Sequence, residues 1–123
     1  MKKTLFLFLS LALFGFISCG KEGTGGKAVI KGQVKHHDKL IPGAVVYIKY
    51  GAKDFPGSNV TYYDASVTAD AQANYAFPDL KKGDYYLFGI GYDSAIALPV
   101  SGGIHAEIKK KTETVEINVP VTE

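Results

Sequence analysis

Apolar and polar residues alternate along most of the chain from residue 28 onward. A period of two places successive side chains on opposite faces of a strand, and clusters of turn-forming residues separate the alternating runs. The pattern predicts seven short strands, at residues 28–35, 44–50, 60–69, 75–77, 85–90, 104–109 and 112–119. No run has a helical period, and no internal repeat is present. The sequence therefore predicts one all-β domain, a seven-stranded β-sandwich over residues 28–123.

Two stretches of this domain match a known signature. Residues 68–87 resemble the pattern T-D-x-x-G-x-Y-x-F … L-x-x-G-x-Y-x-L of carboxypeptidase regulatory-like domains, matched in order by Asp70, Tyr75, Phe77, Leu80, Gly83, Tyr85 and Leu87. An earlier stretch matches the family pattern G-x-V … P-G-A-x-V-x-I, through Gly32, Val34, Pro42, Gly43, Ala44, Val46 and Ile48. Ala73 stands where the family has glycine, so we expect Asn74 to take the positive φ of that turn.

The resemblance implies both a fold and a class of function. Carboxypeptidase regulatory-like domains are transthyretin-like β-sandwiches with an Ig-like Greek-key arrangement, and they associate with proteins or glycans. A fold does not by itself fix a function. The resemblance therefore implies a non-enzymatic binding or accessory module whose partner is an envelope protein or a glycan.

The first residues of the chain predict export. Lys2 and Lys3 precede an apolar run that is too short for a confident membrane-spanning helix, so residues 1–18 are predicted to be a signal peptide. The sequence Phe-Ile-Ser-Cys at 16–19 resembles a bacterial lipobox, with Phe16 in place of the usual leucine. That resemblance implies cleavage before Cys19 and acylation of this residue, which anchors the protein in a membrane. The alternative is an ordinary signal peptide with an incidental cysteine.

Cleavage after residue 18 would leave a glycine-rich linker and a chain with no net charge. Residues 19–27 are rich in glycine and predict a flexible tether between the lipid and the domain. Removal of residues 1–18 leaves 12 lysines against 12 acidic residues, with no arginine. A neutral chain without a basic stripe does not favour nucleic-acid binding. Cys19 is the only cysteine, so an intrachain disulfide is excluded.

Three histidines are the candidates for metal or hydrolytic chemistry. His36 and His37 are adjacent, and adjacent side chains of a strand point to opposite faces unless a turn bends them together. His105 is predicted on the outward face of its strand. Since no set of three or four converging ligands is patterned, we expect solvated histidines and no metal site. Convergence of these histidines with carboxylates in one cleft would favour a metal-dependent or hydrolytic envelope enzyme. Since no catalytic motif is present, and the hydroxyisourate hydrolases of the transthyretin-like fold need an arginine, we expect no enzyme activity and no cofactor.

Two further kinds of site have the right residue types. Calcium prefers oxygen ligands, which the predicted loops offer, although turn capping is the ordinary role of such side chains. The residues concerned are Asp54, Asn59, Asp64, Asp70, Asp79, Asp84 and Asp93. Lys31 and Asn118 lie on the first and last strands, as in the isopeptide-bonded sandwiches of surface adhesins. Alternation argues against such a bond, because it predicts both side chains outward.

Aromatic residues on the less buried sheet faces are the remaining candidates for ligand contact. Tyrosine combines a large contact area with a polar tip, and we select Tyr47, Tyr62, Tyr86 and Tyr92. Residues 92–103 are expected to form an irregular segment that could be a binding loop. Together these patterns predict a lipid-anchored binding module of the bacterial cell envelope, on the outer membrane and either periplasmic or surface-exposed. A structural spacer would instead show no exposed aromatic patch.

Overall fold

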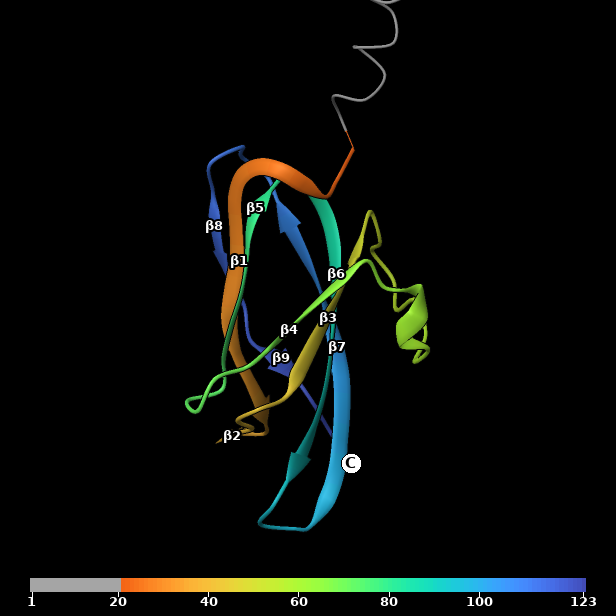
Figure 1. The fold of residues 1–123 in the computed structure, drawn as a ribbon, viewed down its shortest axis with the longest axis vertical. Coiled ribbons are helices and arrows are strands. Elements are labelled where there is room, and N and C mark those ends of the chain that lie inside the picture. Colours follow the sequence, from red (N-terminus) through yellow and green to blue (C-terminus); the bar gives the residue numbers. More distant parts are fainter. Residues whose placement is uncertain (1–20) are drawn as a thin grey trace, which may run out of the picture.

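The chain folds into two β-sheets that pack face to face (Figure 1). The structure is a computed structural model and describes residues 21–123, so the predicted signal peptide and Cys19 lie outside the described residues. Its strands are β1 (Thr24–His36), β2 (Lys39–Leu40), β3 (Val45–Tyr50), β4 (Ala65–Thr68), β5 (Asn74–Leu80), β6 (Gly83–Asp93), β7 (Leu98–Ile108), β8 (Thr114–Glu116) and β9 (Val119–Pro120). One turn of 3-10 helix, η1 (Val60–Tyr62), lies between β3 and β4.

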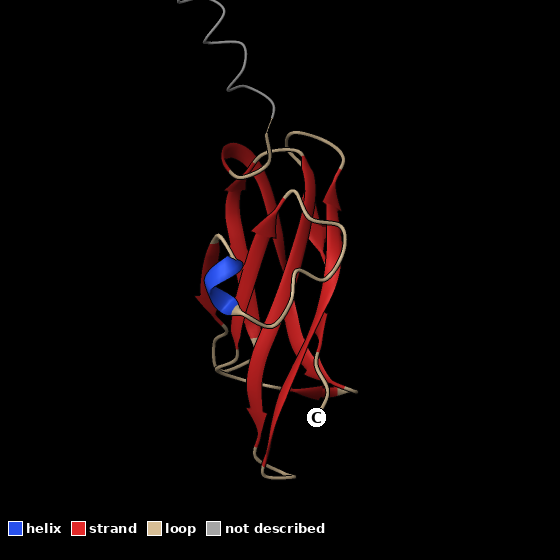
Figure 2. Cartoon of the chain, turned by 90° about the vertical axis from the view of Figure 1, so that its right-hand side faces the viewer, coloured by secondary structure: helices blue, strands red, loops and turns tan. Residues whose placement is uncertain are grey.

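The first sheet is built around β1, its longest strand, and the second contains two long strands, β6 and β7. In the first sheet β1 pairs antiparallel with β2 and β5 and parallel with β8 and β9. In the second sheet the order is β4-β3-β6-β7, and all neighbours are antiparallel. Figure 2 shows the strands of both layers running along the long axis of the molecule. The prediction of an all-β sandwich is confirmed.

The core lies between the two sheets and follows the alternation of the sequence. Val46 and Ile48 of β3 and Leu87 of β6 point inward, whereas their sequence neighbours point outward. The larger fully buried side chains come from both sheets: Ile30, Val34, Ile48, Leu80, Tyr85, Leu87, Ile108 and Val119. Burying one such aliphatic side chain stabilises the fold by about 1.5–3 kcal/mol, so this layer supplies most of the stability.

The described residues form nine strands where the sequence predicts seven, because β2 is not predicted and the predicted strand at 112–119 is two short strands, β8 and β9. Two further boundaries differ from the prediction. Residues 92–103 are not an irregular segment: they form the end of β6 and the first half of β7, in a hairpin that pairs Asp93 with Leu98. Gly102 and Gly103, which read as turn residues in the sequence, lie within β7. Glycine is needed at both positions for lack of space: a Cβ at Gly102 would lie 2.3 Å from the Pro120 carbonyl oxygen, and one at Gly103 would lie 2.5 Å from the Leu87 carbonyl oxygen. The predicted strand at 60–69 begins only at Ala65, after the 3-10 turn.

The turn before β5 also departs from expectation. Ala73, and not Asn74, has the positive φ, at 64°. Asp70 explains this, because its Oδ1 accepts hydrogen bonds from the backbone amides of Gln72 and Asn74 and closes the turn around the alanine. The tight turn thus outweighs the local preference of alanine for negative φ.

The residues that lead into β1 form part of the domain. Thr24–Lys27 belong to β1, so the expected tether does not extend to residue 27. The Gly23 amide donates to the Tyr85 hydroxyl over 2.9 Å, and this hydroxyl donates to the Lys81 carbonyl. The Glu22 carboxylate accepts from the Asp84 amide. We call Glu22, Gly23 and their partners the N-terminal clasp. Within residues 21–123, no helix is long and apolar enough to cross a membrane.

Candidate functional site

The outward face of the second sheet carries a row of aromatic side chains. The register sets Tyr47 of β3 opposite Phe88 of β6, and Tyr86 of β6 between Lys49 of β3 and His105 of β7. These positions alternate with the buried ones, so their side chains lie on the face away from the core. Strand pairing alone therefore brings together residues that are about 20 to 40 positions apart along the chain.

A loop between β3 and β4 folds back over this row. Phe55 approaches Phe88 with a ring-centroid distance of 5.3 Å and Tyr86 with 5.9 Å. Tyr63 stacks on Phe88 at 5.7 Å and contacts Tyr47 at 5.9 Å. Phe88 is consequently only 4% exposed, whereas Phe55 is 52% exposed. We call Tyr47, Phe55, Tyr63, Tyr86 and Phe88 the aromatic face.

Two hydrogen bonds hold the loop in place. The Tyr63 hydroxyl donates to the Gly57 carbonyl over 2.8 Å. The Asp64 carboxylate accepts from the Tyr50 amide over 2.8 Å and lies 3.6 Å from the Lys49 ammonium. Partial burial raises the pKa of the Tyr63 phenol above its ordinary value, so this donor stays protonated at neutral pH. The loop that carries Phe55 and Tyr63 is therefore held against the sheet by specific contacts.

Tyr86 lies against a strand glycine. A Cβ at Gly103 would be 2.6 Å from Cε1 of the Tyr86 ring, so only glycine leaves room for this ring position. Burial raises the pKa of the Tyr86 phenol, and the nearby Asp54 carboxylate adds to the effect. Tyr86 therefore offers a neutral ring with a hydroxyl that can donate or accept.

Polar side chains lie at one end of the aromatic face. His105, the cross-strand neighbour of Tyr86, has its Nε2 at 2.9 Å from Oδ1 of Asp84. Both side chains are partly exposed. On the other side of Tyr86, Lys49 and Asp64 form the ion pair already described. Charged and hydrogen-bonding groups thus flank the half-buried Tyr86 ring on both sides.

The structure brings together only some of the tyrosines selected from the sequence. Tyr47 and Tyr86 share the aromatic face, and Tyr62 is on η1 in the covering loop with 62% of its surface exposed. Tyr92 is also exposed, but it follows Tyr86 by six positions along β6, which is about 20 Å. It lies instead on the β6–β7 hairpin, beside the exposed Ile96 and Leu98. The sequence analysis missed Phe55 and Tyr63, although an isolated apolar residue such as Phe55 in a polar loop is a signal for contact.

The histidines divide into two groups. His36 is buried, with Nδ1 at 2.9 Å from Asp93 Oδ2 and Nε2 at 3.1 Å from Glu123 Oε1. The ring of His37 lies beside it, with centroids 4.6 Å apart. His105 is separate from them and pairs with Asp84. The turn after β1 therefore bends the two adjacent histidines together, beside the carboxylates of Asp93 and Glu123. The expectation of solvated histidines is wrong for His36, which is buried, and the convergence with carboxylates expected of a metal site is present for His36 and His37 but not for His105.

The carboxylate of Asp93 is the shared acceptor for the polar groups around His36. The carboxylate is 2% exposed and accepts from His36, from the Lys39 ammonium at 2.7 Å and from the Ala95 amide at 3.0 Å. These partners, His36 first, hold the pKa of Asp93 well below its usual range. The hydrogen bond from His36 to Asp93 in turn raises the pKa of His36.

The aspartates in the loops have ordinary structural partners. Asp70 closes the turn before β5, Asp64 accepts from a backbone amide, and Asp84 and Asp93 bind histidines. Each is engaged in a different part of the fold. The turn-capping interpretation therefore accounts directly for Asp70 and for Asn59, whose side chain accepts from the Thr61 amide at the start of η1.

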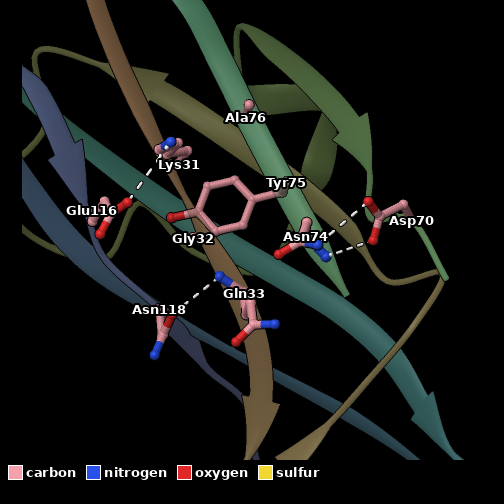
Figure 3. Close-up of a pocket in the computed structure, with 9 residues that line it drawn as sticks. All are labelled: Lys31, Gly32, Gln33, Asp70, Asn74, Tyr75, Ala76, Glu116 and Asn118. Carbon is pink, nitrogen blue, oxygen red and sulfur yellow. Dashed lines mark hydrogen bonds and ion pairs between the residues drawn. The ribbon is translucent and has the colours of Figure 1, made fainter. Parts of the chain in front are cut away.

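A hollow of about 550 Å³ lies on the outward face of the first sheet, shown in Figure 3. The Lys31 ammonium lies 3.7 Å from the Glu116 carboxylate, and Asn118 Oδ1 accepts from the Gln33 amide over 3.0 Å. Lys31 and Asn118 thus have separate partners. The outward position that alternation predicts for Lys31 is confirmed, since its side chain is about half exposed.

A second hollow, of about 640 Å³, lies at the end of the sandwich where the chain enters. It is lined by Lys27, Lys81, Lys82 and Lys111, together with Gly25, Gly26 and Thr112. Four lysines around one hollow create a local positive potential in a chain that is otherwise near neutral. This end of the molecule can therefore attract anions.

Comparisons with known proteins support the fold. No protein-family model matches the chain, and no curated protein matches it. The chain is similar to the structure of a candidate carbohydrate-binding protein from Pseudomonas aeruginosa, with a TM-score of 0.53 and 11% identity, over 80% of this chain and 90% of that one. It is also similar to the major pilin subunit of Bacillus cereus, with a TM-score of 0.52 and 16% identity, over 80% of this chain and 30% of the pilin. At these identities the likeness shows that the chain has a β-sandwich fold.

Proposed function

We propose that the chain is a non-enzymatic, lipid-anchored binding module of the bacterial cell envelope that takes glycans on its aromatic face. The observation that carries this proposal is the set of ring contacts from Tyr86 through Phe55, Phe88 and Tyr63 to Tyr47 on one outward sheet face. In this proposal the domain is a carboxypeptidase regulatory-like module. The similar Pseudomonas protein, described as a candidate carbohydrate-binding protein, supports the choice of ligand class.

The chemistry of the face suits a sugar. The C–H faces of a pyranose ring pack on aromatic rings, while its hydroxyls need hydrogen-bond partners at the edge. Phe55 supplies an exposed ring and Tyr86 a half-buried one, and His105 with Asp84 supplies an acceptor and a donor beside them. The exposed Phe55 ring and its half-buried neighbours favour a binding module over a structural spacer.

A glycan-binding test compares the aromatic face with a distant tyrosine of the same strand. The purified chain is titrated with soluble peptidoglycan fragments and with lipopolysaccharide-derived polysaccharide. We expect Phe55→Ala and Tyr86→Ala each to weaken binding about tenfold, which corresponds to about 1.4 kcal/mol. Tyr92→Ala is the matched control, because this exposed tyrosine lies outside the aromatic face. Equal losses in all three variants, or no binding by the unaltered protein, would overturn the assignment.

The membrane anchor is tested separately. The lysine-lined hollow at the entering end supports an anchored orientation, since lysines near a bilayer are attracted to anionic headgroups. Intact mass and membrane fractionation are measured for the native chain and for Cys19→Ala. We expect a mass that fits cleavage before Cys19 plus acyl chains, and loss of both the added mass and membrane association in the variant. A native product without acyl chains in the aqueous fraction would refute the anchor while leaving the glycan proposal intact.

A further inference from the structure

The far end of β1 gathers groups that the aromatic face does not use. β1 runs from the N-terminal clasp to His36, so the two lie at opposite ends of this strand. His36, His37 and Glu123 each offer a ligand atom there, and these atoms all lie within 4.8 Å of one another. The side chains of His37 and Glu123 are exposed, whereas that of His36 is buried.

The turn after β1 is what makes the two histidines neighbours. His36 pairs with Lys39 across a two-residue connection, and the first residue of that connection, His37, has a φ of 57°. A left-handed backbone at a residue other than glycine is uncommon and costs free energy that the surrounding structure must offset. Its effect here is to bring the His37 ring beside that of His36.

We propose that His36, His37 and Glu123 bind a divalent transition-metal ion, of the class that includes Zn²⁺. Two imidazole nitrogens and one carboxylate oxygen are typical ligands of such ions, whereas calcium and magnesium prefer oxygen alone. Three protein ligands leave at least one coordination position for water or a further ligand. The site would be distinct from the aromatic face and does not depend on glycan binding.

The distances require little rearrangement. In a tetrahedral zinc site with bonds of about 2.0–2.1 Å, neighbouring ligand atoms are about 3.3 Å apart. The 3.1 Å between His36 Nε2 and Glu123 Oε1 already has that length. The remaining separations are at most 4.8 Å, so they have to shorten by no more than about 1.5 Å. Rotation of the exposed His37 and Glu123 side chains is enough to do this while His36 stays in place.

Asp93 prepares His36 to be a ligand. Metal-binding histidines usually donate their second ring N–H to a carboxylate or carbonyl, which fixes both tautomer and ring orientation. Asp93 takes this role, because its buried carboxylate accepts from Nδ1 and leaves Nε2 directed toward Glu123. The Lys39 ammonium and the Ala95 amide hold the other carboxylate oxygen. The donor atom of His36 is therefore oriented before any ion arrives.

The test measures zinc binding by the purified full chain without a polyhistidine tag. Equilibrium dialysis against Zn²⁺ alone gives the stoichiometry, and absorption spectra with Co²⁺ report the coordination geometry. We expect one ion per chain and a tetrahedral Co²⁺ spectrum. His37→Ala and Glu123→Gln should each weaken binding at least about tenfold, and Asp93→Asn by about 10–100-fold through the orientation of His36.

Controls separate the site from the general affinity of histidines for metals. His105→Ala removes a partly exposed histidine that also pairs with a carboxylate, and it should bind Zn²⁺ as the unaltered chain does. Circular dichroism establishes that each variant is folded, and the exposed position of His37 makes its variant the decisive one. Less than half an ion per chain, unchanged affinity in folded His37→Ala, or an equal loss in His105→Ala would each overturn the proposal.

Discussion

Replacing Tyr85 by phenylalanine removes one buried oxygen from the centre of the N-terminal clasp. The Tyr85 side chain is fully buried, and its hydroxyl accepts from the Gly23 amide and donates to the Lys81 carbonyl. Gly23 is buried as well, so its amide would lose its acceptor in a place that water does not reach freely. A buried donor left unpaired costs about 1–3 kcal/mol, and we expect the free energy of unfolding to fall by about 2 kcal/mol.

Urea denaturation followed by circular dichroism measures this loss, since the chain has no tryptophan for fluorescence. At about 4–8 °C per kcal/mol for a domain of this size, the melting temperature should fall by about 8–16 °C. Hydrogen exchange adds a local readout, because the Gly23 amide should exchange faster in Tyr85→Phe. Tyr62→Phe, at a tyrosine that is 62% exposed, is the control and should change neither quantity. A loss below about 0.5 kcal/mol together with unchanged exchange at Gly23 would refute the reasoning.

Three further changes probe the sheet faces and the turn. Phe88→Ala should lower the free energy of unfolding by about 3 kcal/mol, because this ring is buried under the covering loop; a loss below 1 kcal/mol in urea would mean that the loop is not packed there. Gly103→Ala should destabilise by about 1–3 kcal/mol, since the new Cβ meets the Leu87 carbonyl; thermal melting checks this, with Ser101→Ala as the neighbouring control. Two backbone amides hold the pKa of Asp70 below its usual value, so its stabilisation is present above about pH 4 and is lost as the pH falls through the lowered pKa. The stability difference between Asp70→Asn and the unaltered chain should therefore shrink in acid, and a constant difference from neutral pH to acid would contradict it.

The parts of this structure that follow from local pattern were predictable. Alternation places Ile48 and Leu87 in the core and Tyr47 and Tyr86 on the outward face, and the structure agrees. A period of two depends only on strand geometry, so the inward or outward direction of each side chain can be predicted without knowing which strands pair. The division of the chain into inward and outward faces therefore needed no tertiary information.

The contacts that define the two candidate sites could not be predicted in the same way. Phe55 reaches the sheet because the long loop folds back, and no local rule specifies that direction. His36 and Asp93 are 57 residues apart, and their contact depends on how the two sheets face each other. One signal was present: Asp93 falls on the inward side of β6 in line with Tyr85 and Leu87, and an acidic residue at an inward position needs a partner. The positive φ of Ala73 shows the limit of residue preferences, since the hydrogen bonds that the Asp70 carboxylate accepts from backbone amides outweigh them.

The N-terminal clasp sets the standoff distance of the domain if Cys19 carries the lipid. Glu22 is already bound to the domain, so three residue steps, at most about 11 Å, separate it from Cys19. A connection this short restricts the rotation of the domain relative to the membrane and orients its lysine-rich end toward the bilayer surface. Because β1 runs from the clasp to His36, the His36 end of the domain then lies on the side away from the membrane. A polymer lying parallel to the membrane would meet the aromatic face from the side, without having to pass beneath the protein.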